Sequence, residues 1–233
     1  MSSKETNLKE KFRIALNSTA KVISDDFDIN YQNIENKKPQ DFISIEIDNL
    51  INQSDFVRLR AETDSNALKK KFSDDLIYKK NLPINTSSRS LYNIAEKIRY
   101  EALGGKMLKG IEKNFNENYS QIINKKRKDQ LKTKEDVPVT EAFELYMLKN
   151  FHKIKLNSLT SKMLNFWEKD FDESIEKHKE FLIKNLEDQQ AYSSKFTQIL
   201  DGMDIFQSDE DNEKEEQNQD QGQDNPSNDD QSK

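Results

Sequence analysis

Much of the chain places apolar residues three or four positions apart, the spacing of one face of an α-helix. This pattern predicts helices over 6–24, 54–72, 88–123, 139–151 and 158–203. The last pattern indicates two helices or one bent rod. Pro83 interrupts the chain before the third pattern, and we expect the Ser and Thr residues that follow it to cap that helix.

Two short segments alternate apolar and polar residues instead, which is typical of strands. They are FDINY at 27–31 and FISIEI at 42–47, and Asn, Lys and Pro39 lie between them. We therefore predict a mainly α fold, a helical body with a small two-stranded β-hairpin near residues 27–47.

The segment 208–233 contains no aliphatic or aromatic side chain, so it cannot bury a core. It carries ten acidic residues against two lysines, a net charge of −8, which leaves +2 for the rest of a chain whose total is −6. We predict a helical domain over 1–207 and a disordered acidic tail over 208–233 that acts as a flexible spacer.

Composition excludes several classes of protein. The absence of cysteine excludes disulfide scaffolds, thiolate zinc sites and cysteine nucleophiles. No apolar run approaches the roughly 18 residues of a membrane span, and the N-terminus lacks the apolar core of a signal peptide. We expect a soluble, cytoplasmic protein without membrane association.

Three of the five glycines, Gly104, Gly105 and Gly110, fall inside the third helical pattern, where each costs about 1 kcal/mol relative to alanine. A phosphate-binding loop would follow a strand and would place Ser or Thr after its lysine, but GGKMLKGI does neither. We predict that small residues here admit a second helix or form a bend between two helices. Leucine at Gly104 or Gly105 should therefore weaken folding or partner docking.

The titratable residues give no strong signal of catalysis. The two histidines, His152 and His178, have no second histidine within a helical turn, as zinc sites usually require. His178 lies on an apolar stripe and is predicted to be a core or boundary residue.

Carboxylates are frequent, and we expect them on solvated helix faces. The pair Glu96 and Arg99, three residues apart and followed by Glu101, would then contribute only about 0.2–0.5 kcal/mol. The same interpretation applies to a second polar cluster, formed by Glu187, Asp188 and Gln189.

A basic run offers a weak case for nucleic-acid binding. It consists of Lys125, Lys126, Arg127, Lys128, Lys132 and Lys134. No aromatic residue lies among them to stack on bases, so binding would be weak and salt-sensitive. A solvated linker is the favoured interpretation.

Several stretches taken together resemble the CobT-type subunit of aerobic, ATP-dependent cobaltochelatase. Three are STAKVISDDFDINY from Ser18, RAETDSNALKKKF from Arg60, and a motif of a glutamate, an arginine, Glu-Ala and two glycines. The residues of this motif are Glu96, Arg99, Glu101, Ala102, Gly104 and Gly110, followed by Asn114 and Tyr119. VPVTEAFELYMLKNF, NFW at 165–167 and LEDQQAYSSKFTQILDGMD continue the resemblance, which spans most of residues 10–215.

The resemblance marks a set of candidate family-motif or partner-interface residues. They are Arg60, Asp64, Ser65, Glu96, Arg99, Glu101, Gly104, Gly110, Trp167, Glu187, Asp188 and Gln189. The chain also departs from the family. Its loop at 33–40 is shorter, and Phe72 to Asp74 stand where many members have a cysteine and a histidine. Members generally continue past the acidic linker into a von Willebrand factor A-type domain with a metal-binding motif, which implies here a truncated, incomplete or split protein.

In the family, as the resemblance implies, this subunit assembles with an AAA+ ATPase subunit (CobS-type). The pair drives cobalt insertion into hydrogenobyrinic acid a,c-diamide by a large subunit (CobN-type). ATP, magnesium and cobalt are then expected on the complex, and no cofactor, metal or catalytic residue on this chain. An adaptor in a hetero-oligomer is the resulting prediction. Two alternatives stay open, an adaptor of another AAA+ ATPase unrelated to cobalt and a nucleic-acid-binding helical protein.

Overall fold

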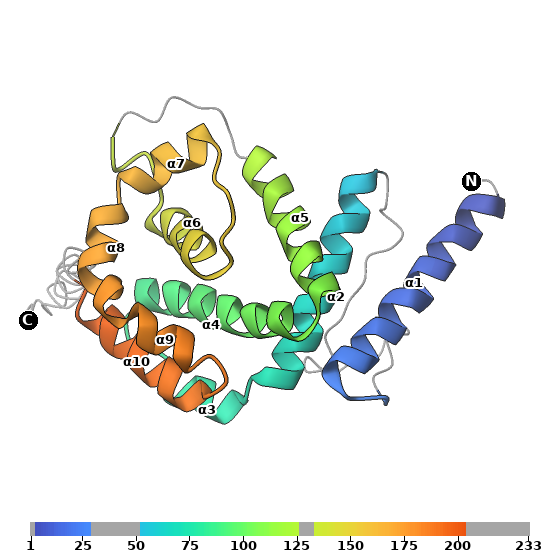
Figure 1. The fold of residues 1–233 in the computed structure, drawn as a ribbon, viewed down its shortest axis with the longest axis horizontal. Helices are drawn as coiled ribbons and strands as arrows, with labels where there is room; N and C mark the ends of the chain where they lie inside the picture. The colour runs from blue at the N-terminus through green and yellow to red at the C-terminus, as the bar shows by residue number, and fades with distance from the viewer. Residues whose placement is uncertain (1–2, 29–51, 126–132, 204–233) are drawn as a thin grey trace, which may run out of the picture.

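A computed structural model describes residues 3–28, 52–125 and 133–203, and these parts of the chain are helical without any strand (Figure 1). The helices are, in chain order, α1 (Ser3–Ser24), α2 (Gln53–Phe72), α3 (Asp75–Lys80), α4 (Thr86–Met107), α5 (Lys109–Lys125), α6 (Val139–Phe151), α7 (Ser158–Asn165), α8 (Glu168–Ile175), the 3-10 turn η2 (Glu176–His178), α9 (Lys179–Lys184) and α10 (Gln189–Asp201).

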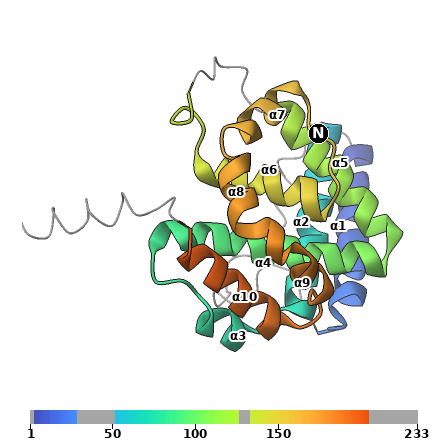
Figure 2. The ribbon, with the colours of Figure 1, turned by 60° about the vertical axis from the view of Figure 1, so that its left-hand side comes forward.

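Helix α4 crosses the middle of the molecule and contacts α2, α5, α6 and α10 (Figures 1 and 2). Its apolar residues Leu91, Ala95 and Ile98 are at most 1% exposed. They lie three to four positions apart, so they line one side of the helix. Because neighbours also cover its other sides, α4 buries polar residues as well, and these define the candidate site.

Helices α1 and α2 run in the same direction at the edge of this body. Phe12, in the third turn of α1, packs on Phe56 in the first turn of α2, with ring centroids 4.9 Å apart, and Asp26, just after α1, pairs with Lys70 near the end of α2. Leu16 and Leu59 form a small buried cluster between these contacts. The interface therefore extends from the middle of α1 to its C-terminal end and along the length of α2.

Four of the five helical predictions locate the elements well. Helices α1, α2 and α6 confirm the patterns at 6–24, 54–72 and 139–151. The pattern at 88–123 is two helices, because Leu108 is extended (φ −141°, ψ 118°) between α4 and α5. The predicted bend near the glycines is thus confirmed. The capping prediction was wrong in detail, since the Asn85 side chain accepts the hydrogen bonds of Ser87 and Ser88 N–H.

The pattern at 158–203 is not one rod or two helices but α7, α8, η2, α9 and α10. Asn157 caps α7 and Asp188 caps α10, so separate helices begin after each. The apolar stripe persists across these breaks because each of the four α-helices turns its apolar side to the same core, through Met163, Phe171, Ile175, Leu182 and Phe196. Periodicity reports which side of a helix is buried and does not report where one helix ends.

The predicted hairpin lies outside the described residues from position 29 onward, and Phe27 and Asp28 form a turn. The predicted tail, 208–233, also lies outside them. Helix α3 was not predicted. It is six residues long and buries none of them, so it leaves no apolar period in the sequence.

Candidate functional site

The motif residues Glu96, Arg99 and Glu101 of α4 are 3%, 0% and 1% exposed, so the prediction that they lie on a solvated face was wrong. Positions 96 and 99 lie about 60° apart around a helix, whereas 99 and 101 lie about 160° apart. The motif therefore supplies two buried polar clusters on opposite sides of α4.

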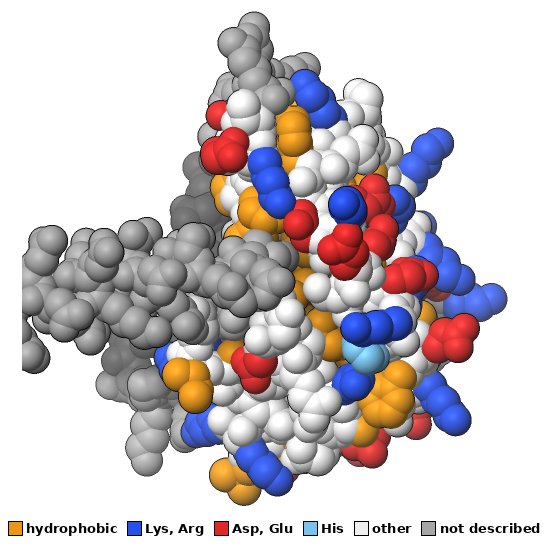
Figure 3. Space-filling model, turned by 90° about the vertical axis from the view of Figure 1, so that its left-hand side faces the viewer, with side chains coloured by type: hydrophobic (Ala, Val, Ile, Leu, Met, Phe, Trp, Pro, Cys, Tyr) orange, Lys and Arg blue, Asp and Glu red, His pale blue; other side chains and the backbone are white. Residues whose placement is uncertain are grey.

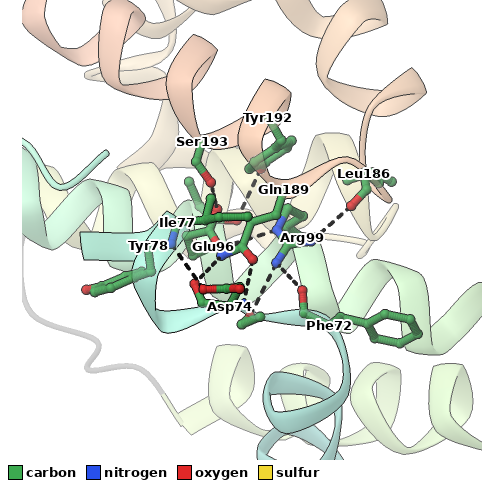
Figure 4. A network of polar contacts seen from close by, with 12 residues as sticks. Phe72, Asp74, Ile77, Tyr78, Glu96, Arg99, Leu186, Gln189, Tyr192 and Ser193 are labelled. Atoms are coloured by element: carbon green, nitrogen blue, oxygen red, sulfur yellow. Dashed lines mark hydrogen bonds and ion pairs between the residues drawn. The ribbon is translucent and has the colours of Figure 1, made fainter. Parts of the chain in front are cut away.

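Arg99 is the centre of the first cluster (Figure 4). One Nη donates to the carbonyl of Leu186 at 3.0 Å, and the other donates to the carbonyl of Phe72 at 2.7 Å and to Ser73 Oγ at 3.2 Å. Arg99 Nε lies 3.3 Å from Glu96 Oε2. One guanidinium thus ties α4 to the end of α2 and to the loop before α10.

Glu96 completes the charge balance of this cluster. Its Oε1 accepts from Ser193 Oγ at 2.6 Å, and its Oε2 accepts from Gln189 Nε2 at 3.3 Å. Gln189 in turn accepts the backbone N–H of Asp74 at 2.6 Å, at the start of α3. A buried charge is tolerated when it is paired and hydrogen-bonded. We call Glu96, Arg99, Gln189 and Ser193 the Arg99 hub.

Glu101 points to the opposite side of α4, toward α2 and α5. Its Oε1 accepts from Ser65 Oγ at 2.6 Å and its Oε2 accepts from Tyr119 OH at 2.5 Å. His152 Nε2 lies 3.9 Å from the same Oε2 and has no hydrogen-bond partner among the described residues. We call Ser65, Glu101, Tyr119 and His152 the Glu101 cluster.

Burial dominates the ionisation of this cluster. It raises the pKa of Glu101, although Lys97 and the hydrogen bonds from Ser65 and Tyr119 act in the opposite direction. Burial, with the neighbouring Glu101 charge, also holds the pKa of Tyr119 well above its usual value. Each shift follows from the low polarity of the site, which disfavours the charged form.

Asp64 forms a smaller buried contact between α2 and α5. Its Oδ2 accepts from Asn114 Nδ2 at 2.6 Å, while its Oδ1 is buried without a hydrogen bond in the described parts of the chain. Burial raises the pKa of Asp64. On the same side, Gly104 is buried directly against Leu68 of α2.

The structure does not bring every candidate residue into these clusters. Arg60, Gly110 and Glu187 are exposed, and Asp188 serves as the cap of α10 through a 3.0 Å bond from the N–H of Ala191.

Trp167 lies away from both clusters and is half-buried. Its Nε1 donates to the carbonyl of Val137 at 3.0 Å, and Lys134 Nζ lies 4.1 Å from its ring centroid. Trp167 thus holds the segment before α6 in place, whereas the buried glutamates join α4 to other helices.

Sequence reasoning missed Ser193 and the part that His152 plays. Ser193 follows Gln189 by four residues, so the two share one face of α10, and this spacing was the available signal. Nothing in the sequence relates His152, at the end of α6, to Glu101 of α4, because only the packing of α6 on α4 joins them.

The prediction that His178 is a boundary residue is confirmed, since it is half-buried. It lines an open groove beside α9 and α10, together with Phe181, Asp188, Ser194 and Lys195. Figure 3 shows this side of the molecule, where basic and hydrophobic side chains lie close together near a histidine.

We expect His152 to make the protein sensitive to acid. Burial lowers its pKa to about 4, whereas an exposed histidine titrates near 6.5. Between these values the unfolded chain binds a proton that the folded chain does not, so stability falls as the pH decreases, by at most about 3 kcal/mol. Urea unfolding of wild type and His152→Gln at pH 7 and pH 4.5 measures this effect.

The variant should lose less stability than wild type over this interval. The raised pKa of Glu101 acts in the opposite direction, since it favours the folded state in acid, so it should flatten the remaining dependence. His178→Gln is the matched control and should follow wild type more closely. Equal acid dependence of His152→Gln and wild type would refute the assignment.

The two clusters bind helices to one another and are closed to a substrate in this conformation. Within the described residues, no three His, Asp or Glu side chains converge as a metal site requires. Nor does any described helix combine the length and the apolar character needed to cross a bilayer.

In this helical body the buried polar residues of the motif make internal contacts between helices. A family model described as cobalamin biosynthesis protein CobT matches residues 6–233, and the chain belongs to this family. Membership confirms the resemblance drawn from the sequence motifs and implies a role in cobalamin biosynthesis, as part of a cobaltochelatase complex. No solved structure matches the chain.

Proposed function

We propose that the chain is an adaptor subunit of cobaltochelatase. It binds an AAA+ ATPase subunit (CobS-type), and the pair supports ATP-driven insertion of cobalt into hydrogenobyrinic acid a,c-diamide by a large subunit (CobN-type). The proposal places ATP and magnesium on the ATPase subunit, and the cobalt and tetrapyrrole substrates on the large subunit.

The observation that supports this role is the burial of the family motif. Glu96, Arg99 and Glu101 are each hydrogen-bonded inside the body, so these three residues join α2, α4, α5 and α10 to one another. Catalytic carboxylates would be expected to face a cleft. A rigid body with a precise internal frame suits a subunit that positions partners.

Co-purification with the AAA+ ATPase subunit, with and without Mg-ATP, tests the proposal. We expect a stable complex with the full chain, and equal binding by a version that ends at residue 207, because the docking body is helical. Failure of both versions to bind would refute the adaptor role. ATP hydrolysis by the purified chain alone would refute the assignment of ATP and magnesium to the ATPase subunit.

The nucleic-acid alternative receives no support from the described part of the basic run. Lys134 pairs with Asp170 at 2.7 Å, and Lys125 donates to Ser54 Oγ. The run's other members, 126–128 and 132, lie outside the described residues. The second alternative, an adaptor of an unrelated AAA+ ATPase, predicts binding to that ATPase in preference to the CobS-type subunit.

A further inference from the structure

The Glu101 cluster contains two hydrogen-bond acceptors that face each other. His152 Nε2 lies 3.9 Å from Glu101 Oε2 and has no partner among the described residues, and the two side chains are 6% and 2% exposed. The imidazole is also hydrogen-bonded to the backbone carbonyl of Ile98. Since Nε2 is unpaired, Nδ1 makes this bond and carries the ring hydrogen, so Nε2 of the neutral ring can only accept.

An ionised Glu101 would leave this contact unsatisfied. A carboxylate has no hydrogen to donate, so two buried acceptors would face each other and Nε2 would stay without a hydrogen bond. A hydrogen on Glu101 Oε2 removes the conflict. The two atoms need to approach by only about 1 Å to reach ordinary hydrogen-bond distance.

The groups around Glu101 do not supply a paired cation. In the described parts of the chain Glu101 forms no ion pair with a lysine or an arginine. Burial is the largest influence on its ionisation and favours the neutral form. Lys97 favours the charged form, whereas Glu144 favours the neutral one. The titratable and charged groups that face the carboxyl are Lys97 and Tyr100 from α4, Tyr119 from α5, and Glu144 and His152 from α6 and its end.

The two remaining hydrogen bonds of Glu101 suit a neutral acid as well as a carboxylate. Ser65 donates to Oε1 and Tyr119 donates to Oε2. A protonated carboxyl group keeps lone pairs on both oxygens, so it can accept these two bonds while its O–H donates a third. The side chain would then be fully hydrogen-bonded, and so would His152.

Glu96 provides the contrast on the same helix. Its Oε2 lies 3.3 Å from Arg99 Nε, and Ser193 and Gln189 donate to its two oxygens. All three neighbours are donors, and one carries a positive charge. Glu96 is therefore held as a carboxylate.

We propose that Glu101 keeps its proton in the folded chain at neutral pH and donates it to His152 Nε2. The motif then contains one ionised and one neutral buried glutamate, five residues apart. A carboxyl group kept neutral by an apolar site so that it can donate a hydrogen bond is established chemistry. The proposal concerns the helical body itself and does not depend on the identity of its partner subunits.

This arrangement makes the packing of α6 on α4 depend on one proton. Between about pH 4.3 and pH 6.5 the unfolded chain carries that proton on His152, whereas the folded chain carries it on Glu101. Folding then moves the proton without net uptake, so stability changes little. Above about pH 6.5 folding takes up a proton, so the contact loses stability as the pH rises.

NMR of the full chain, labelled with ¹³C at the glutamate carboxyls and with ¹⁵N in histidine, tests the proposal at pH 7. We expect Glu101 at the chemical shift of a protonated acid, Glu96 at that of a carboxylate, and His152 with a hydrogen on Nδ1 alone. A carboxylate shift for Glu101 would overturn the proposal and would indicate a bridging water instead. Hydrogens on both nitrogens of His152 would overturn it too.

Unfolding between pH 5 and pH 7 gives a second test. In His152→Gln only Glu101 remains, so the folding equilibrium constant should decrease by up to tenfold per pH unit as the pH rises. In Glu101→Gln, whose amide can still donate to Nε2, it should decrease by up to tenfold per unit as the pH falls below about 6.5. The reference is the double variant Glu101→Gln/His152→Gln, which has neither group.

Glu96→Gln is the matched control for a buried glutamate. It loses its ion pair with Arg99, so it should melt at a lower temperature than wild type and keep the wild-type dependence on pH. Slopes of the same sign in the two single variants would overturn the proposal, as would a Glu101→Gln variant with the pH dependence of wild type.

Discussion

Replacement of Arg99 by methionine is expected to destabilise the folded chain by about 3–5 kcal/mol, the usual cost of breaking a buried ion pair. The variant leaves the Glu96 carboxylate buried without its cation, and it also frees the carbonyls of Phe72 and Leu186. Since domains are stable by about 5–15 kcal/mol in total, this loss is a large fraction of the whole. Denaturant unfolding followed by circular dichroism measures it.

Arg13→Met is the matched control for the same chemical change at the surface. Arg13 pairs with Glu10 three residues away, and both side chains are well exposed, at 33% and 49%. Its loss should cost less than about 1 kcal/mol. If Arg99→Met were no more destabilising than Arg13→Met, the Arg99 hub would not stabilise the packing of α2 and α10 on α4 as we describe.

A second variant separates the lost bonds from the orphaned charge. Glu96→Gln in the Arg99→Met background removes the uncompensated negative charge and keeps a similar shape. We therefore expect the double variant to be more stable than Arg99→Met alone, so that the two changes are not additive. If the destabilisation of the double variant equalled the sum of the two single effects, the stability lost in Arg99→Met would be due to lost packing rather than to the unpaired charge.

Gly104→Ala is expected to destabilise the chain by about 1–3 kcal/mol, although alanine is the better helix former by about 1 kcal/mol. A Cβ at this position would lie 2.2 Å and 2.6 Å from the two Cδ atoms of Leu68. Leu68 is fully buried, so its side chain cannot move aside without disturbing the core. The free energy of unfolding measures the cost.

Gly105→Ala is the neighbouring control. Its Cβ would meet Glu112 only at 3.5 Å, an ordinary contact, so the variant should be neutral or up to about 1 kcal/mol more stable. The structure thus separates two glycines that the sequence treats alike. Equal effects of the two alanines would contradict the close approach of α2 to α4.

Removal of part of the Leu68 side chain tests the cause. In a Leu68→Ala background the clash is absent, so the added methyl group at Gly104 should cost little or should stabilise the chain. Leu68→Ala alone is expected to cost about 2–5 kcal/mol because it leaves a cavity. Additive effects of the two substitutions would show that Leu68 is not what Gly104 accommodates.

The helical patterns at 6–24, 54–72 and 139–151 predicted real elements because an apolar stripe at helical spacing has no other compact use. The clustered glycines also supported a correct prediction, that of a close helix contact or a bend. A glycine inside a helix lowers stability, so three of them in one region indicate that packing or a bend requires them. The pattern at 158–203 predicted burial correctly and connectivity wrongly, because short helices joined by capped turns keep the same stripe.

The family motif shows most clearly what the sequence could not predict, which is the burial of its charged residues. The sequence placed Glu96 and Arg99 three residues apart, a spacing equally compatible with a weak surface pair and with a buried hub. The difference depends on α2, α6 and α10, which cover α4 from distant parts of the chain. Ser193 and His152 reach the motif only through this packing.

The sequence by itself therefore determined the helical class, the apolar faces, the need for a close contact or bend at the glycines and, through its motifs, the CobT family. Tertiary structure alone decided which charges are buried and which glycine is indispensable. The reason is physical: helical periodicity depends on neighbours three or four residues apart, whereas the burial of a charge depends on every element that packs around it.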